Sequence, residues 1–166
     1  MPLLTKKIKH YAKILRPQVD ILAVMYHGGF ESDPETGKAT EPNRGENEGY
    51  QILTKIPEVD VLLTGHQHRR LNLVTRDTAI VQPGYRGEAV AEVVLDIDDD
   101  TKKIKSMSTK LIDTNDYDPD PVIVDIVSDL DKRTQKWLDQ PIAHLDKPAR
   151  IENAMKGRIE ARHLLI

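Results

Sequence analysis

Two short apolar runs, each ending in a cluster of glycine and histidine, constrain the fold of this chain more than any other feature. The first spans residues 19–25 and ends at Tyr26-His27-Gly28-Gly29, and the second spans residues 59–64 and ends at Gly65-His66-Gln67-His68. Both are rich in branched side chains, which is typical of a strand buried in an α/β protein. A helical pattern precedes each run, over residues 5–16 and 46–56. The sequence therefore predicts two consecutive helix–strand units.

The second half of the chain has strand patterns that follow one another without helices. These patterns cover residues 71–75, 79–82, 89–97 and 103–112. The links between them have turn composition and lengths that suit antiparallel neighbours. Asp120-Pro121 then gives a helix N-cap with proline at the first helical position, and an apolar stripe continues to about residue 139. We expect an α/β fold in which helix–strand units precede a mainly antiparallel sheet and a long helix.

Composition excludes several classes of function. The chain has 166 residues, and 24 Lys and Arg against 27 Asp and Glu leave a net charge of −3. Binding to the DNA or RNA backbone needs a basic face, so no nucleic-acid polymer is expected as a partner. The longest apolar run, residues 21–25, is far shorter than the roughly 20 residues of a membrane span. Because the chain has no cysteine, disulfides, thiolate metal sites and cysteine nucleophiles are excluded.

Three of the six histidines, His27, His66 and His68, directly follow the carboxyl ends of the predicted buried strands. Loops at these strand ends open to solvent and carry the ligand-binding residues of many α/β proteins. Neutral imidazole is a good ligand for Zn²⁺, Mn²⁺, iron and Ni²⁺. By itself, an H-x-H pair is more often a structural or surface feature than a metal site. The repetition of the Gly-His cluster at two strand ends favours a metal site.

The glycines beside these histidines have a predicted role of their own. We expect Gly28, Gly29 and Gly65 to adopt backbone angles that a side chain would forbid and to leave room for a metal or phosphate. His66 and His68 would point the same way in an extended segment, whereas in a turn they would diverge toward two different ions, as a two-metal site requires.

Three segments resemble the calcineurin-like metallophosphoesterases, and most closely their bacterial 2′,3′-cyclic-nucleotide 2′-phosphodiesterase/3′-nucleotidase and 5′-nucleotidase branch. The segments are Tyr26–Glu31, Gly45–Tyr50 and Val59–His68. The resemblance implies two divalent ions (Zn, Mn, Fe or similar) and a nucleotide phosphoester as substrate. By position, His27 and His66 bind one ion and His68 binds its neighbour. Four residues lie around these ligands or on the substrate side: Gly28, Gly29, Gly65 and Gln67.

The same resemblance implies that residues 1–145 are the C-terminal half of a four-layer α/β/β/α metallophosphoesterase domain. The family's D-x-H, G-D and G-N-H-D/E motifs, which supply the bridging aspartate, further ligands and the catalytic histidine, do not occur in residues 1–166. We therefore expect the N-terminal half of the domain as a partner and negligible turnover by this chain alone. Residues 146–166 are expected to form a charged tail. The family branch is typically extracytoplasmic or attached to the cell wall.

Two alternative functions fit the same residues. One is a small hydrolase in which His27, His66 and His68 hold a single Zn²⁺ with an open fourth position. The other is a non-catalytic assembly module that pairs with another chain, or with a second copy as a homodimer, through its uncovered sheet, since a half-domain exposes apolar surface and an open strand edge.

Several charged residues near the predicted site have two interpretations. Arg69, Arg70 and Arg86 could attract phosphate, but salt bridges to the many carboxylates are the simpler expectation. Asp60 could orient a ligand histidine from outside the metal's immediate ligands. A polar boundary residue at the start of a strand is the simpler role for it.

Overall fold

The computed structural model describes residues 3–42, 44–142 and 144. The chain divides into two compact units, residues 1–118 and residues 119–166. The elements of the first unit are α1 (Leu3–Leu15), η1 (Arg16–Gln18), β1 (Ala23–Tyr26), α2 (Gly49–Lys55), β2 (Val61–Thr64), β3 (Arg70–Thr75), β4 (Thr78–Pro83), β5 (Ala89–Ile97), β6 (Ile104–Asp113) and η2 (Thr114–Asp116). The second unit contains α3 (Pro121–Leu138). The predicted tail, residues 146–166, lies outside the described residues.

A four-stranded sheet with the order β1-β2-β4-β3 forms the centre of the first unit. Strand β2 pairs in parallel with both β1 and β4, and β3 pairs antiparallel with β4. Tyr26 at the end of β1 is level with Thr64 at the end of β2. The segments that follow these two strands therefore start at the same edge of the sheet. Every side chain of β4 except that of Pro83 is buried, as expected for a central strand.

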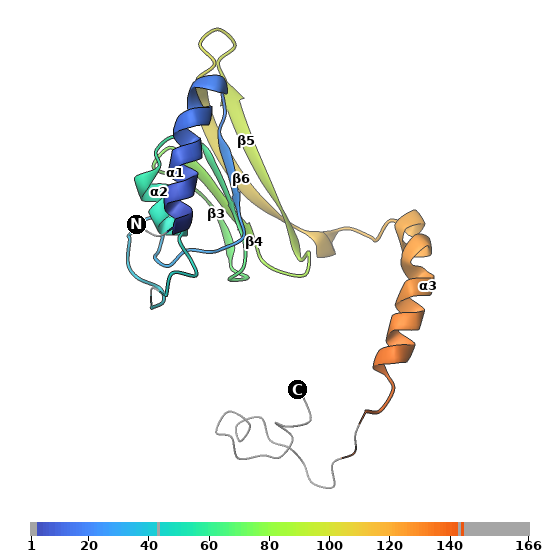
Figure 1. The fold of residues 1–166 in the computed structure, drawn as a ribbon. Coiled ribbons are helices and arrows are strands. Elements are labelled where there is room, and N and C mark those ends of the chain that lie inside the picture. Colours follow the sequence, from blue (N-terminus) through green and yellow to red (C-terminus); the bar gives the residue numbers. More distant parts are fainter. Residues whose placement is uncertain (1–2, 43, 143, 145–166) are drawn as a thin grey trace. The chain divides into compact units, whose positions relative to one another are not determined.

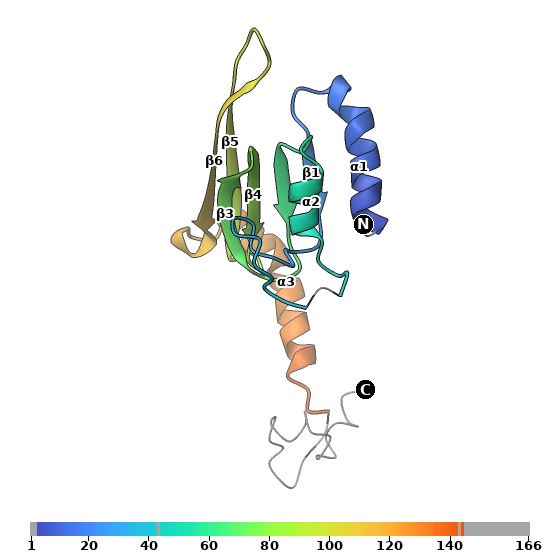
Figure 2. The same ribbon diagram turned by 90° about the vertical axis from the view of Figure 1, so that its left-hand side faces the viewer.

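The first unit has three layers, which Figures 1 and 2 show from two sides. Helices α1 and α2 cover one face of the four-stranded sheet, and the β5–β6 hairpin covers the other. The apolar core between the helices and the sheet includes Phe30, Ile52, Ile56, Leu62 and Ile80, all nearly inaccessible to solvent. Burial of such side chains drives the helix–strand units together. The predicted α/β class, with helix–strand units before antiparallel strands and a long helix, is confirmed.

Strands β5 and β6 form a separate two-stranded antiparallel sheet. The expectation that β4 and β5 are antiparallel neighbours in one sheet is therefore wrong. The reason lies in the link between them, where Gly84, Arg86 and Gly87 all have positive φ. These angles turn the chain out of the plane of the first sheet, so that β5 packs as part of another layer.

Strand β1 begins at Ala23, four residues later than the sequence predicts. The Arg16 guanidinium explains the difference, because it donates to the carbonyl oxygens of Val19 (2.8 Å) and Asp20 (2.5 Å). Residues 19 and 20 are thus tied to the end of the preceding helix instead of to a neighbouring strand.

Helix α3 begins as predicted at Asp120-Pro121. The Asp120 side chain accepts hydrogen bonds from the main-chain N–H groups of Val122 (2.8 Å) and Ile123 (3.3 Å). These contacts satisfy two of the N–H groups that lack partners at a helix start. Among the residues that the structure describes, no helix combines the length and apolarity that crossing a membrane requires.

Candidate metal centre

The three predicted ligands lie at the carboxyl edge of the four-stranded sheet. His27 directly follows β1, and His66 and His68 follow β2. All three side chains are exposed. Since β1 and β2 run in parallel and end at the same level, the segments that follow the two strands start side by side.

His27 and His66 form a close pair. Their ring centroids are 5.7 Å apart, with the ring planes inclined by 70°. The two loops are joined by a hydrogen bond from the Gly65 N–H to the Gly28 carbonyl (3.1 Å). A Cβ atom at Gly65 would lie 3.3 Å from His27 Nδ1, so the absence of a side chain leaves space beside this imidazole. The pair fits one divalent ion as two exposed nitrogen donors.

His66 and His68 have different surroundings. His66 Nε2 lies 2.7 Å from Glu46 Oε1. The His68 ring stacks on Tyr85 at a centroid distance of 5.0 Å, and the Arg86 guanidinium lies over the same tyrosine at 5.5 Å. Both histidines have a positive φ, 67° at His66 and 58° at His68. The G-H-Q-H segment is therefore a turn and not an extended strand.

The histidines supply only part of a metal site. Within residues 3–42, 44–142 and 144, no group of three or more His, Cys, Asp or Glu side chains is placed so that it could share one ion. The structure brings His27 and His66 together but does not assemble the single three-histidine zinc site. Since a dedicated zinc site uses at least three protein ligands, further ligands are needed from elsewhere.

The backbone angles predicted for the three glycines are wrong. Gly28, Gly29 and Gly65 are absent from the described residues with positive φ. Instead, side chains of the protein occupy the space beside the first two. A Cβ at Gly28 would lie 2.1 Å from the Tyr26 ring, and one at Gly29 would lie 1.9 Å from Gln67 Oε1. These glycines make room for a tyrosine and an amide, and the left-handed angles are at the histidines.

The Tyr26 ring that covers Gly28 also fixes the segment before α2. Its hydroxyl donates to the Glu46 carbonyl (3.0 Å) and accepts from the Glu48 N–H (3.1 Å). Burial raises the pKa of this phenol, and the hydrogen bond from Glu48 partly opposes that shift. Tyr26 therefore remains a neutral hydrogen-bond donor at physiological pH.

Sequence reasoning missed two buried glutamates that support the helices beside the site. The Glu31 carboxylate accepts from the N–H groups of Tyr50 (3.1 Å) and Gln51 (3.2 Å) at the start of α2. Glu48 accepts from the N–H (2.9 Å) and the hydroxyl of Thr5 near the start of α1. Each carboxylate satisfies helix N–H groups and complements the positive end of a helix dipole. No local signal marks them, because their partners are 19 to 43 residues away.

The arginines near the site are partly committed to other groups. Arg70 forms an ion pair with Asp113 at 2.6 Å, as the simpler expectation predicts. Arg69 contacts the Phe30 carbonyl and the Thr40 hydroxyl instead of a carboxylate. Arg86 is exposed and lies over Tyr85.

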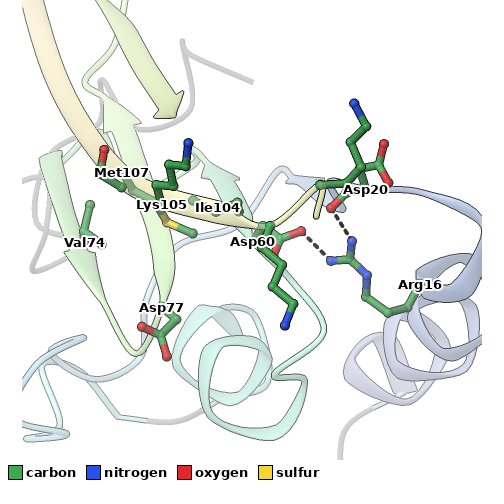
Figure 3. A pocket seen from close by; sticks show the side chains of 11 residues that line it. Arg16, Asp20, Asp60, Val74, Asp77, Ile104, Lys105 and Met107 are labelled. Carbon is green, nitrogen blue, oxygen red and sulfur yellow. Dashed lines mark hydrogen bonds and ion pairs between the residues drawn. The ribbon is translucent and has the colours of Figure 1, made fainter. Parts of the chain in front are cut away.

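A cavity of about 510 Å³ lies at the opposite, amino end of the sheet (Figure 3). Asp60 is in its wall and accepts from Arg16 Nη1 (2.5 Å) and the Leu22 N–H (2.7 Å). Asp60 therefore binds the end of α1 to the sheet and does not orient a histidine.

Comparison with known proteins shows which fold carries these histidines. No protein-family model matches the sequence, and no curated protein sequence matches it. The chain is similar to the crystal structure of a provisionally assigned 5′-nucleotidase from Staphylococcus aureus in complex with alpha-ketoglutarate, with 35% identity over 93% of this chain and a TM-score of 0.73. It is also similar to the calcineurin-like phosphoesterase YfkN from Bacillus subtilis, with 13% identity over 82% of this chain and a TM-score of 0.63. The chain has the calcineurin-like metallophosphoesterase fold.

The metallophosphoesterase resemblance expected from the sequence is thus confirmed. The match covers only part of these proteins, however. The chain spans 30% of the S. aureus chain and 45% of the B. subtilis chain. Within this metallophosphoesterase fold, the His27–His66 pair and the exposed His68 mark the candidate metal centre.

Proposed function

We propose that this chain is the histidine-bearing half of a metal-dependent phosphoester hydrolase that acts on nucleotides. The substrates would be 2′,3′-cyclic nucleotides or nucleoside monophosphates. The observation that carries the proposal is the His27–His66 pair, 5.7 Å between centroids, at the carboxyl ends of two adjacent parallel strands. The 35% identity to the S. aureus protein supports a nucleotide as the substrate class.

In the complete centre, His27 and His66 would hold one divalent ion and His68 would hold a second. Divalent ions in such centres activate water and offset the negative charge of a phosphoryl group. The chain itself provides imidazole nitrogens at an exposed edge of the sheet. It provides none of the family motifs that carry the bridging carboxylate. Without a bridging negative charge, two dications repel each other strongly at short range. The chain alone therefore binds at most one ion, and weakly.

The remaining ligands would come from the segment that forms the first half of the domain. Strand β1 offers it an edge, because among the described residues β1 pairs only with β2. Met25 on this strand is 85% exposed. Beside the edge, apolar side chains of α1 and β1 line a cavity of about 360 Å³. An uncharged open edge next to apolar surface is a suitable place for another strand to pair.

Hydrolysis measured with and without a partner tests this proposal. The chain is assayed with a 2′,3′-cyclic nucleotide and a nucleoside monophosphate in Mn²⁺, alone and mixed with a polypeptide that carries the D-x-H, G-D and G-N-H-D/E motifs. We expect negligible turnover alone and turnover in the mixture that is lost in His66→Ala. Robust turnover by the chain alone, or an unaffected His66→Ala mixture, would contradict the proposal.

The same β1 edge favours a second candidate function, non-catalytic self-assembly with a second copy of the chain. Two copies could pair through β1, since the strand carries no charged residue that would prevent it. Sedimentation equilibrium checks this. A dimer that Met25→Lys converts to a monomer supports self-assembly, and a monomeric wild-type chain at high concentration rules it out.

A further inference from the structure

A closed ring of hydrogen bonds connects the two histidine motifs. The Gly29 N–H donates to Asn47 Oδ1 (2.6 Å), and Asn47 Nδ2 donates to Glu41 Oε1 (2.6 Å). Gln67 Nε2 donates to the other oxygen of the same carboxylate, Glu41 Oε2 (3.0 Å). Gln67 Oε1 then accepts from the Phe30 N–H (2.8 Å). The ring closes because Gly29 and Phe30 are neighbours in the chain.

The chemistry of the ring allows only one arrangement of its two amides. An ionised carboxylate can only accept hydrogen bonds, so both amide NH₂ groups must face Glu41. Both amide oxygens must then face main-chain N–H groups, as observed at Gly29 and Phe30. Gln67 Nε2 also donates to the Phe30 carbonyl (3.1 Å). Bonds to a charged acceptor are the stronger class, and Asn47 is only 5% exposed. The ring is therefore a rigid connection.

Gln67 lies between two of the candidate ligands, His66 and His68. Both have a left-handed backbone conformation that side chains rarely adopt. Such a conformation persists only where the surroundings hold it in place. The ring provides that support, because it ties the residue between the two histidines to the residues that follow His27. The Gln67 amide fills the space beside Gly29, since a Cβ at this glycine would lie 1.9 Å from Gln67 Oε1.

We propose that Gln67, Glu41 and Asn47 are positioning residues that hold His66 and His68 in place relative to His27. Their benefit to catalysis rests on the proposed metal-dependent function. Their effect on the histidine geometry does not, because every bond of the ring joins two groups of the chain itself.

The first test measures this geometry in the metal-free chain. His27 and His66 are close enough in the wild type for a nuclear Overhauser effect between their ring protons. In Gln67→Ala we expect this effect to disappear while the methyl spectrum of the core stays unchanged. Thr78→Val is the matched control, because it removes a buried hydrogen bond to the Val59 carbonyl (3.0 Å) at the other end of β2. Thr78→Val should keep the nuclear Overhauser effect between the two histidine rings. If Gln67→Ala also keeps this effect, the proposal is overturned.

A charge exchange makes the test specific. Gln67→Glu places a second carboxylate against Glu41 and should also remove the His27–His66 effect. In the double variant Glu41→Gln/Gln67→Glu, an amide at position 41 again faces a carboxylate at position 67. We expect the double variant to regain the effect in part, since the bonds of the ring can form again while a carboxylate oxygen at position 67 then faces the Phe30 carbonyl oxygen instead of donating to it. No recovery in a folded double variant would contradict the ring as the positioning element.

A Zn²⁺ titration separates this proposal from the proposed function. If both hold, Gln67→Ala weakens binding by about tenfold, as for other residues that orient metal ligands, and Thr78→Val does not. If the wild-type chain binds no Zn²⁺, the metal role of the histidines loses its support. The nuclear Overhauser measurement then still decides whether the ring positions them.

Discussion

The two ends of the four-stranded sheet use their polar side chains differently. At the amino end, the Arg16 guanidinium binds Asp60 and the carbonyls of Val19 and Asp20. Asp60 also accepts from the Leu22 N–H. At the carboxyl end, polar groups fix the loops, while His27, His66 and His68 remain exposed. The Arg16–Asp60 ion pair at the amino end thus holds structural elements together, whereas the carboxyl end has three exposed imidazole rings.

This difference shows that the presence of a cavity does not by itself locate the site. A cavity of about 510 Å³ lies at the amino end, where the Arg16–Asp60 pair attaches α1 to the sheet. The three histidines lie exposed at the carboxyl end of the sheet. The comparison predicts that substitutions at the amino end change stability alone, and that substitutions of the histidines change metal binding alone.

Gly29→Ala should cause the largest loss of unfolding free energy, because it disrupts the ring of hydrogen bonds at the carboxyl end of the sheet. The new Cβ would lie 1.9 Å from Gln67 Oε1 and must displace the amide. Overpacking of this kind costs about 3 kcal/mol of unfolding free energy. Urea denaturation measures it. In the double variant Gly29→Ala/Gln67→Ala the clash is gone, so the two losses should not add. Full additivity would refute the assigned role of Gly29.

Asp60→Asn should cause the second-largest loss of unfolding free energy, and it tests the amino end of the sheet. It removes the charge that Arg16 and the Leu22 N–H contact, at a cost of about 2 kcal/mol. The Zn²⁺ dissociation constant should not change. Asp77→Asn is the control, since Asp77 lines the same cavity but is exposed on a turn. Its effect on unfolding should stay within about 0.5 kcal/mol. Equal losses of unfolding free energy in Asp60→Asn and Asp77→Asn would contradict the role assigned to Asp60.

His66→Ala should show the reverse of Asp60→Asn, with unchanged stability and weaker Zn²⁺ binding. The side chain is exposed, so we expect the unfolding free energy to change by less than about 0.5 kcal/mol. Loss of one of two ligands should weaken Zn²⁺ binding by at least about tenfold, or about 1.4 kcal/mol. Calorimetric titration measures this, with His10→Ala on α1 as the control. Unchanged affinity would exclude His66 as a ligand.

Asp113→Asn should have the smallest effect, and it depends on pH. The hydrogen bond from Arg70, which links β3 to β6, lowers the pKa of Asp113 below its ordinary value of 3.8. A carboxylate with a lowered pKa in the folded state stabilises the protein above its ordinary pKa, and the stabilisation is lost as the pH falls through the folded value. The melting temperature of the variant should thus be slightly lower at pH 7, with the difference disappearing in acid. A constant difference down to pH 2 would contradict the ion pair.

The sequence predicts the elements well where apolar periodicity is strong. The segments around Ile52 and Leu62 have the expected helix and strand, and both residues are fully buried. The proximity of His27 and His66 also follows from two parallel strands that end at one edge. The shorter β1 was not predictable, because a long-range side-chain contact of Asp60 and the carbonyl contacts of Arg16 decide where pairing begins.

The hydrogen bonds that hold the candidate site in place were the feature least predictable from the sequence. Glu41, Asn47 and Gln67 act through partners 6 to 37 residues away, and polar residues in a long loop have no periodicity that would identify such partners. The left-handed conformations at His66 and His68 are equally hidden, since glycine is the usual signal for them.

The most direct measurement of the central claim is a titration of the ¹⁵N-labelled chain with Mn²⁺, which broadens amide signals close to the bound ion. The account predicts broadening at Gly28, Gly65 and Gln67, beside the three histidines, and sharp signals at Arg16 and Asp60. Broadening centred on the amino end of the sheet or on the acidic turn at Asp98–Asp100, or no selective broadening at all, would contradict the claim that the carboxyl end carries the metal ligands.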